Sequence, residues 1–183
     1  MQLTRLAIPD VIKITPRVFD DERGFFYERF TTKKFKDFGI EVSFVQDNIS
    51  YSKKNVLRGL HYQLPPHGQG KFVYVTRGRV LDVAVDIRKS SPTFGQFVSE
   101  ELSDENHTAL FIPEGFAHGF ITLSDEAIFQ YKTTNFYAPE ADRGVLFSDP
   151  DIGVPWGVAE PLVSEKDGVL PLLQDIPNSE LYE

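Results

Sequence analysis

The sequence contains no cysteine, so neither disulfide bonds nor thiolate chemistry can contribute to the fold or to an activity. A cysteine-free chain suits a reducing compartment, and we expect a cytoplasmic protein. No apolar run approaches the roughly 20 residues of a membrane-spanning helix. The N-terminal stretch MQLTRLAIPDVIK has charges and a proline where a signal peptide needs an uninterrupted apolar segment, so we expect no export signal.

Positive charge is scarce as well, since 19 Lys and Arg stand against 27 Asp and Glu and give a net charge of −8. Nucleic acids and anionic membranes need a broad basic surface, so the sequence predicts neither as a partner. A small anionic ligand is compatible with this charge if a few Arg and Lys side chains cluster locally. The 183 residues suit one domain, 1–183, with a substantial core.

Short β-type segments and aromatic residues are abundant. The 16 Phe and seven Tyr suit half-buried pleated surfaces, although any one ring could instead stack on a planar ligand. The run 71–88, KFVYVTRGRVLDVAVDIR, predicts a hairpin around Arg77-Gly78, and aspartates alternate with apolar residues in its second arm. A further pair of strands is expected around 124–126.

Helix signals are few. The segment TTKKFKDFG (31–39) predicts a short helix that begins at a threonine N-cap and ends at Gly39. The segment SEKDGVLPLL (164–173) allows one helical turn. Frequent turns with little helix predict an all-β fold, either an antiparallel sandwich or a barrel.

The segment IPEGFAHGF (112–120) contains Pro113-x-Gly115-x-x-His118 and resembles the second motif of cupins. That motif ends in Asn, and Thr122 stands at the corresponding position here. We therefore expect a cupin-type double-stranded β-helix jelly roll with a few short helices.

The first cupin motif is altered at two of the positions that bind metal in metal-binding cupins. Gly59, His61 and Gly78 fit its spacing, but Gln63 and Lys71 occupy positions that hold a histidine and a glutamate in metal-binding cupins. An ammonium group has no lone pair for a cation and repels it, so we expect no metal site. A positive charge in that pocket would suit an oxyanion.

Several of these residues also have a purely structural interpretation. His61 could be a satisfied core histidine, His118 could shape a turn, and Tyr131 could be an ordinary sheet residue. Asp167 follows Ser164 at the spacing of a capping box, in which a carboxylate holds a backbone N–H.

The spacing of Arg58 and His61 raises a further question. In an ideal strand these two side chains point to opposite faces. A shared pocket would therefore require a bulge, and Gly59 is a suitable place for one.

Seven motifs, in this order, resemble the dTDP-4-dehydrorhamnose 3,5-epimerase family over nearly the whole chain. They are DERGFFYERF, FVQDNIS, VLRGLHYQ, GKFVYVTRG, FIPEGFAHGF, YKTTNFYAPEADRG and VSEKD. The resemblance implies an isomerase of the rhamnose pathway that inverts C3 and C5 of a dTDP-linked 4-keto-6-deoxyhexose without metal or cofactor. Alternatives are a relative that inverts only C3 or only C5, a catalytically silent nucleotide-sugar binding module, and a metal cupin such as a dioxygenase.

The resemblance also implies roles for individual residues. His61 would be the base, Asp167 the carboxylate that orients its imidazole, Tyr131 the proton donor on the opposite face and Lys71 the group that stabilises the enolate oxygen. The implied substrate-binding residues are Arg23, Phe26, Glu28, Gln46, Asp47, Asn48, Arg58, His118, Tyr137, Asp142 and Lys166.

Among the implied binding residues, Tyr137 would stack on thymine, and Arg23, Arg58 and Lys166 would bind the diphosphate. Members of the family are homodimers in which an N-terminal strand reaches the neighbouring subunit. Arg23, Phe26 and Glu28 would then serve the partner's site.

Overall fold

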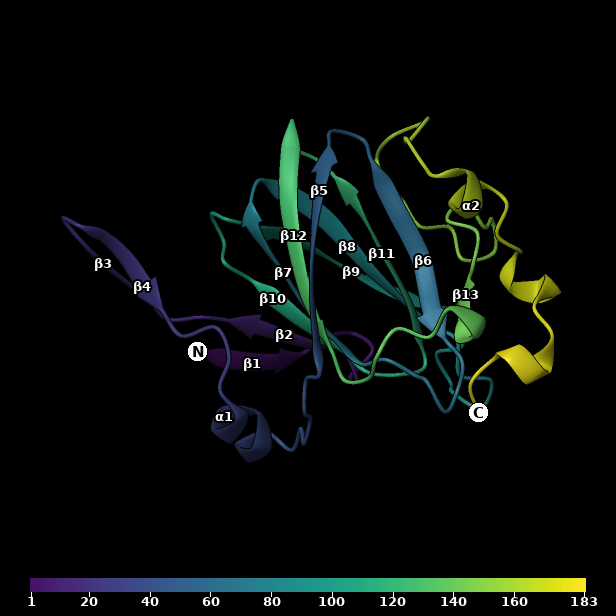
Figure 1. Cartoon of the computed structure of the whole chain (residues 1–183), viewed down its shortest axis with the longest axis horizontal. Coiled ribbons are helices and arrows are strands. Elements are labelled where there is room, and N and C mark those ends of the chain that lie inside the picture. Colours follow the sequence, from purple (N-terminus) through teal and green to yellow (C-terminus); the bar gives the residue numbers. More distant parts are fainter.

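Two antiparallel β-sheets face each other in a computed structural model that describes all residues from 1 to 183 (Figure 1). In spatial order, the first sheet consists of β1 (Gln2–Arg5), β2 (Ile12–Thr15), β10 (Ala109–Ile112), β7 (Lys71–Arg77), β12 (Glu126–Thr133) and β5 (Gln46–Lys53). The second consists of β13 (Asp142–Gly144), β6 (Leu57–Gln63), β11 (Phe116–Thr122), β8 (Arg79–Asp86) and β9 (Phe97–Ser103). The expected all-β jelly roll is confirmed.

A separate hairpin extends from the sandwich. It consists of β3 (Val18–Asp21) and β4 (Gly24–Tyr27), which pair only with each other, and Figure 1 shows it projecting beyond the edge of the first sheet. The helices are α1 (Thr32–Asp37), α2 (Glu165–Gly168) and the 3-10 turns η1 (Pro139–Ala141), η2 (Leu173–Asp175) and η3 (Asn178–Glu180). None of them is long and apolar enough to cross a membrane.

The two predicted hairpins are wrong. β7 and β8 follow each other around Gly78, yet β7 pairs with β10 and β12 while β8 pairs with β9 and β11. β11 and β12 are likewise in different sheets. A turn places two strands near each other, but the free hydrogen-bonding edges decide the pairing. Here each turn carries the chain from one sheet to the other, which is how a jelly roll buries the inner faces of both sheets.

Successive side chains of a strand point to opposite faces of its sheet, and the buried apolar residues form three separate clusters. Residues such as Val73, Val80 and Phe129 form the core between the sheets. Val83, Val85 and other outward-facing residues of the second sheet are covered by the C-terminal segment. A third cluster lies on the outer face of the first sheet. The predicted alternation in β8, with its aspartates opposite its apolar residues, is therefore confirmed.

Both predicted helical segments are present. The helix α1 buries Phe35 and ends before Gly39, whose φ of +88° is the left-handed conformation that a glycine adopts easily. Thr31 stands at its N-cap but makes no capping hydrogen bond with its side chain. The turn α2 begins after Ser164, whose hydroxyl accepts a hydrogen bond from the Asp167 N–H at 3.1 Å.

Candidate active site

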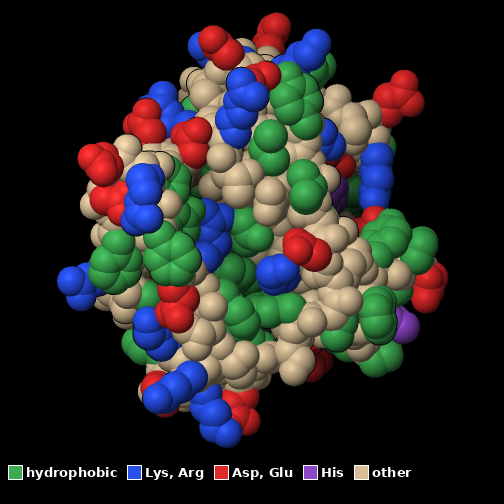
Figure 2. Space-filling model, turned by 60° about the vertical axis from the view of Figure 1, so that its left-hand side comes forward, with side chains coloured by type: hydrophobic (Ala, Val, Ile, Leu, Met, Phe, Trp, Pro, Cys, Tyr) green, Lys and Arg blue, Asp and Glu red, His purple; other side chains and the backbone are tan.

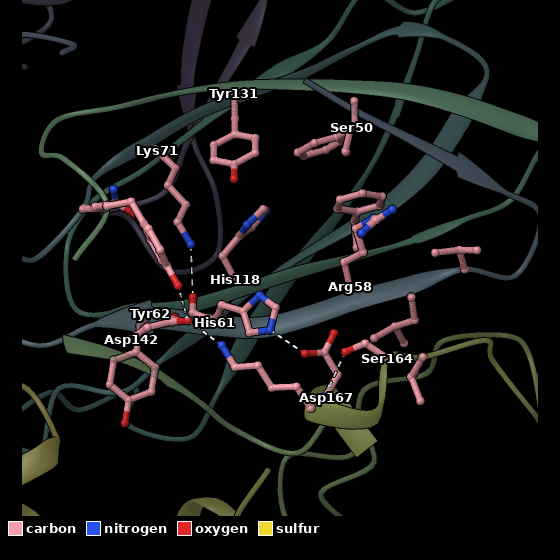
Figure 3. Close-up of a pocket in the computed structure, with 18 of the residues that line it drawn as sticks. Ser50, Arg58, His61, Tyr62, Lys71, His118, Tyr131, Asp142, Ser164 and Asp167 are labelled. Carbon is pink, nitrogen blue, oxygen red and sulfur yellow. Dashed lines mark hydrogen bonds and ion pairs between the residues drawn. The ribbon is translucent and has the colours of Figure 1, made fainter. Parts of the chain in front are cut away.

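A cavity of about 590 Å³ lies between the two sheets at one end of the sandwich (Figure 3). Its walls come from inner-facing residues of both sheets, from the segment around α2 and from the loop after β12. Of the residues that the sequence predicts, those that line it are Arg58, His61, Lys71, His118, Tyr131, Tyr137, Asp142, Lys166 and Asp167.

A histidine–carboxylate pair stands at the centre of this cavity. His61 Nε2 lies 2.7 Å from Asp167 Oδ1, and Asp167 Oδ2 accepts a hydrogen bond from the Gly59 N–H at 3.3 Å. Burial acts to raise the pKa of the Asp167 carboxyl, but these bonds outweigh burial and hold the pKa below its ordinary value. The carboxylate therefore holds the Nε2–H tautomer of His61, and Nδ1 is directed into the cavity (Figure 3).

Asp167 makes only one half of the capping box that its spacing from Ser164 allowed. Its backbone N–H is capped by Ser164, whereas its carboxylate bonds to His61 and Gly59. The side chain does not return to the N-cap as a capping box would require. The cap therefore places the turn, and the turn directs the carboxylate at the imidazole.

A bulge in β6 brings Arg58 and His61 to the same face. In the pairing of β6 with β11, His61 lies opposite His118 and Arg58 opposite Phe120, so the two residues Gly59 and Leu60 face the single residue between them on β11. Gly59 has φ of +129°, and a Cβ atom there would lie 2.5 Å from the Cα of Gly119. Only glycine fits this position, and the bulge expected there is confirmed.

Tyr131 faces His61 from the opposite sheet. It lies on β12, with its ring next to Phe129 and its hydroxyl directed into the cavity in Figure 3. Burial raises the pKa of the Tyr131 phenol, against a smaller opposing effect of Arg58. The phenol is consequently protonated near neutral pH and can act as a proton donor.

Lys71 lies on β7, the neighbour of β12 in the first sheet, and lines the same cavity. Its Nζ donates a hydrogen bond to the His61 carbonyl oxygen at 3.1 Å. Burial lowers the pKa of the Lys71 ammonium to about 8, although Asp142 and Asp82 act in the opposite direction. Near pH 7 the side chain is still largely cationic, so it supplies positive charge at the cavity wall.

His118 belongs to a second histidine–carboxylate pair, which sequence analysis did not identify. Its Nε2 lies 2.9 Å from Oδ2 of Asp82, a carboxylate with no exposed surface. Burial lowers the pKa of the His118 imidazole, and Asp82 only partly compensates. The signal was present in the alternation of β8, which placed Asp82 on the inner face, but its partner lies on the adjacent strand β11.

The other end of the cavity is polar and more exposed. Asp142 accepts hydrogen bonds from the Tyr137 hydroxyl, at 3.1 Å, and from Lys166. Arg58 lies on the other side of His61 from Asp142 in Figure 3, and its guanidinium donates hydrogen bonds to the Ser52 hydroxyl and the Tyr51 carbonyl. The cavity can accommodate a planar group beside Tyr137 and anionic groups beside Arg58 and Lys166.

Six predicted binding residues do not line the cavity within one chain. Arg23 and Phe26 lie on the projecting hairpin, where Phe26 is 71% exposed, and Glu28 follows it and pairs with Lys34. The others, Gln46, Asp47 and Asn48, lie on β5, where Asp47 pairs with Lys132 on the outer face. Asn48 Nδ2 is buried without a hydrogen-bond partner on the inner face, opposite Tyr131 in register.

Several lining residues were not predicted from the sequence. They include Ser50, Tyr62, Gln69, Phe120, Phe129 and Ser164, whereas Gln63 was noted only as the replacement of a cupin metal ligand. Ser50 could have been inferred, because it lies two residues beyond Asn48 on the same face of a strand. The aromatic residues carry no such signal, since they are equally typical of a core. No group of three or more His, Asp or Glu side chains is arranged to hold a metal ion.

Known proteins resemble this chain in both sequence and structure. A family model described as dTDP-4-dehydrorhamnose 3,5-epimerase matches residues 5–175. The dTDP-4-dehydrorhamnose 3,5-epimerase of Shigella flexneri is 58% identical over 168 residues, which cover 91% of this chain and 93% of the relative.

Two solved structures are informative for the site. That of dTDP-6-deoxy-D-glucose-3,5-epimerase RmlC from Legionella pneumophila, in complex with dTDP-4-keto-L-rhamnose, has a TM-score of 0.95 and 46% identity and covers 100% of this chain and 97% of that one. That of ChmJ, a 3'-monoepimerase from Streptomyces bikiniensis in complex with dTDP-quinovose, has a TM-score of 0.88 and 35% identity and covers 93% of this chain and 87% of that one.

Proposed function

The chain belongs to the dTDP-4-dehydrorhamnose 3,5-epimerase family, and from this premise we propose how its site inverts C3 and C5 of dTDP-4-dehydro-6-deoxy-D-glucose. The product is dTDP-4-dehydro-L-rhamnose, and the activity is that of an isomerase in dTDP-rhamnose biosynthesis. The observation that carries the mechanism is that His61 and Tyr131 face one cavity from opposite sheets, with the Lys71 ammonium in the same cavity and bonded to the His61 carbonyl. The cysteine-free composition supports a cytoplasmic location.

Proton removal is the first step. The C4 ketone acidifies the protons on C3 and C5, because each resulting carbanion delocalises onto O4 as an enolate. Nδ1 of His61 takes the proton, and Asp167 holds the imidazole in place and stabilises the imidazolium that forms. The 2.7 Å contact between His61 and Asp167 supports this assignment, since it leaves one ring nitrogen free for the substrate.

Inversion needs a proton donor on the other face of the sugar ring. The Tyr131 phenol is protonated near neutral pH and comes from the opposite sheet, so it can return a proton to the face away from His61. The Lys71 ammonium stabilises the negative charge that develops on O4. His118, fixed by Asp82, completes this end of the cavity as a binding residue for the sugar.

The nucleotide lies toward the exposed end of the cavity. The Tyr137 ring stacks on thymine, and its hydroxyl is held by Asp142, which also binds Lys166. Arg58 and Lys166 are the cations that the same chain offers to the diphosphate. Ser50 Oγ and Asn48 Nδ2, on β5, are buried polar atoms without hydrogen-bond partners.

The hairpin residues reach a site only in a second subunit, and we include a homodimer in the proposal. Phe19, Phe25 and Phe26 are 52%, 59% and 71% exposed on a hairpin that projects from the sandwich. Figure 2 shows hydrophobic side chains exposed in several groups on the face it displays. Three exposed phenylalanine side chains on one short hairpin favour association with another surface. Arg23, Phe26 and Glu28 would then add to the partner's cavity.

Solvent exchange distinguishes this function from its closest alternative. The similarity to a 3'-monoepimerase makes inversion of C3 alone the second candidate. Incubation of the enzyme with dTDP-4-dehydro-6-deoxy-D-glucose in D₂O should place deuterium at both C3 and C5, as seen by NMR of the product. Label at a single carbon would eliminate the double epimerase, and no label would eliminate both candidates. EDTA in a parallel reaction should leave the rate unchanged, whereas a metal cupin would lose activity.

A further inference from the structure

The ring of Tyr137 is carried by a loop that side chains must hold in place. Residues 134–138 connect β12 to η1 and form neither helix nor strand. Tyr137 itself is 54% exposed, and the only hydrogen bond of its side chain goes to Asp142. If this loop were mobile, a ligand that stacks on the ring would have to order the loop, and the cost of that ordering would weaken binding.

Gln63 holds the peptide groups on both sides of Tyr137. Its Nε2 donates to the Phe136 carbonyl at 3.1 Å, and its Oε1 accepts from the Ala138 N–H at 2.8 Å. The second hydrogen on Nε2 goes to the His67 carbonyl at 2.6 Å. Gln63 is only 3% exposed, so these bonds are protected from water.

A second glutamine holds Tyr137 itself. Gln46 Oε1 accepts from the Tyr137 N–H at 3.0 Å, and Gln46 Nε2 donates to Asn48 Oδ1 at 2.9 Å. Two side chains from β5 and β6 thus hold backbone groups of three consecutive residues in the loop. These strands belong to different sheets, so the loop is fixed to both walls of the cavity.

Gln63 has no side-chain hydrogen-bond donor left for a substrate, and it is almost fully buried. Both of its amide hydrogens and one lone pair of its carbonyl oxygen are used within the chain. Its own backbone carbonyl accepts from the Tyr182 hydroxyl at 2.5 Å, which ties this strand end to the C-terminus. The position that holds a metal ligand in metal-binding cupins therefore has a different task here.

We propose that Gln63 is a positioning residue that fixes the Tyr137 loop and thereby sets the affinity for the nucleotide, without taking part in the chemistry. This inference rests on the proposed function of the site, in which Tyr137 stacks on thymine. It predicts that a change at Gln63 acts on nucleotide binding through Tyr137 and leaves proton transfer at His61 and Tyr131 intact.

The test is a double-mutant cycle with dTDP as the probe. Gln63→Glu keeps the size of the side chain and the oxygen that accepts from the Ala138 N–H. It replaces Nε2 by an oxygen, which repels the carbonyls of His67 and Phe136. We expect about tenfold weaker dTDP binding by calorimetry and an equal rise in KM, with kcat within about threefold of wild type. In a Tyr137→Ala background, Gln63→Glu should weaken dTDP binding by no more than about twofold. Gln174→Glu, the same change on an exposed residue, is the matched control.

Equal effects of Gln63→Glu with and without Tyr137 would overturn the inference, as would a fall in kcat at unchanged dTDP affinity. Gln46→Met, which removes the acceptor for the Tyr137 N–H, provides the same cycle if Gln63→Glu does not fold. In that cycle, coupling to Tyr137 supports the inference and additivity overturns it. Failure of the proposed function is separate, because it would appear as absent deuterium exchange in a wild-type protein that still binds dTDP.

Discussion

His61 and Asp167 are 106 residues apart in the sequence, and a bulge in β6 and a capped turn bring their side chains to 2.7 Å. The carboxylate is almost fully buried, whereas the imidazole side chain keeps 33% of its surface exposed toward the cavity. This asymmetry suits a pair in which one member orients and the other reacts. A substitution of the buried member, Asp167, therefore tests the role of the pair.

Asp167→Asn should lower kcat by about 10²–10³, because the amide no longer stabilises the imidazolium and can hold the wrong tautomer. The rate of deuterium uptake from D₂O should fall by the same factor, since proton removal itself is affected. Asp175→Asn, on an exposed carboxylate, serves as the control and should be unchanged. A kcat for Asp167→Asn close to that of wild type would remove Asp167 from the mechanism.

Tyr131→Phe should separate proton exchange from inversion. His61 can still remove a proton and return a solvent deuteron to the same face, so recovered substrate should gain deuterium while its configuration is retained. Epimerised product should form about 10²–10³ times more slowly, because the donor on the opposite face is missing. NMR of the recovered sugar reports both quantities in one experiment. Normal product formation by this variant would show that another group supplies the proton.

The lowered pKa of Lys71 predicts that activity falls at alkaline pH. Burial lowers the pKa of its ammonium to about 8, so the charge that stabilises the enolate oxygen is present below that pH and is lost above it. A profile of kcat/KM, which reports the free enzyme, should therefore fall above about pH 8. Lys71→Met should reduce kcat/KM by about 10²–10³ and abolish this limb. An unchanged alkaline limb in that variant would assign it to a different group.

Gly59→Ala should be strongly destabilising although it adds one methyl group. The added Cβ would lie 2.5 Å from the Cα of Gly119, and φ of +129° is unfavourable for any other residue. We expect a loss of roughly 3–5 kcal/mol in the free energy of unfolding, measured by urea denaturation. Gly157→Ala is the matched control, because its φ of +74° is also positive but nothing lies within 4 Å. It should cost only about 1 kcal/mol. Similar losses in both variants would contradict the steric argument.

The sequence indicated Gly59 as the place for a bulge if Arg58 and His61 share a pocket, but it did not indicate which strands pair. Side-chain alternation and motif spacing are local properties, and they suffice to place the inner-facing residues of β8 and the turn α2. Strand pairing depends on which edges remain free after the whole sandwich has assembled, so the turn at Gly78 was indistinguishable from that of a hairpin. For the same reason, the sequence did not show that Asp82 pairs with a residue of β11 or that Gln63 bonds to the loop at 136–138.

The projecting hairpin allows a test of the homodimer by complementation. If Arg23 of one subunit serves the site of the other, His61→Asn and Arg23→Ala are each defective as homodimers. In a hybrid dimer, the subunit with intact His61 receives intact Arg23 from its partner, so one site of the two is complete. Co-refolding equal amounts should restore about a quarter of wild-type activity, because about half of the dimers are hybrids and each has one working site. Activity no higher than the mean of the two variants would mean that the hairpin serves its own subunit or no site at all.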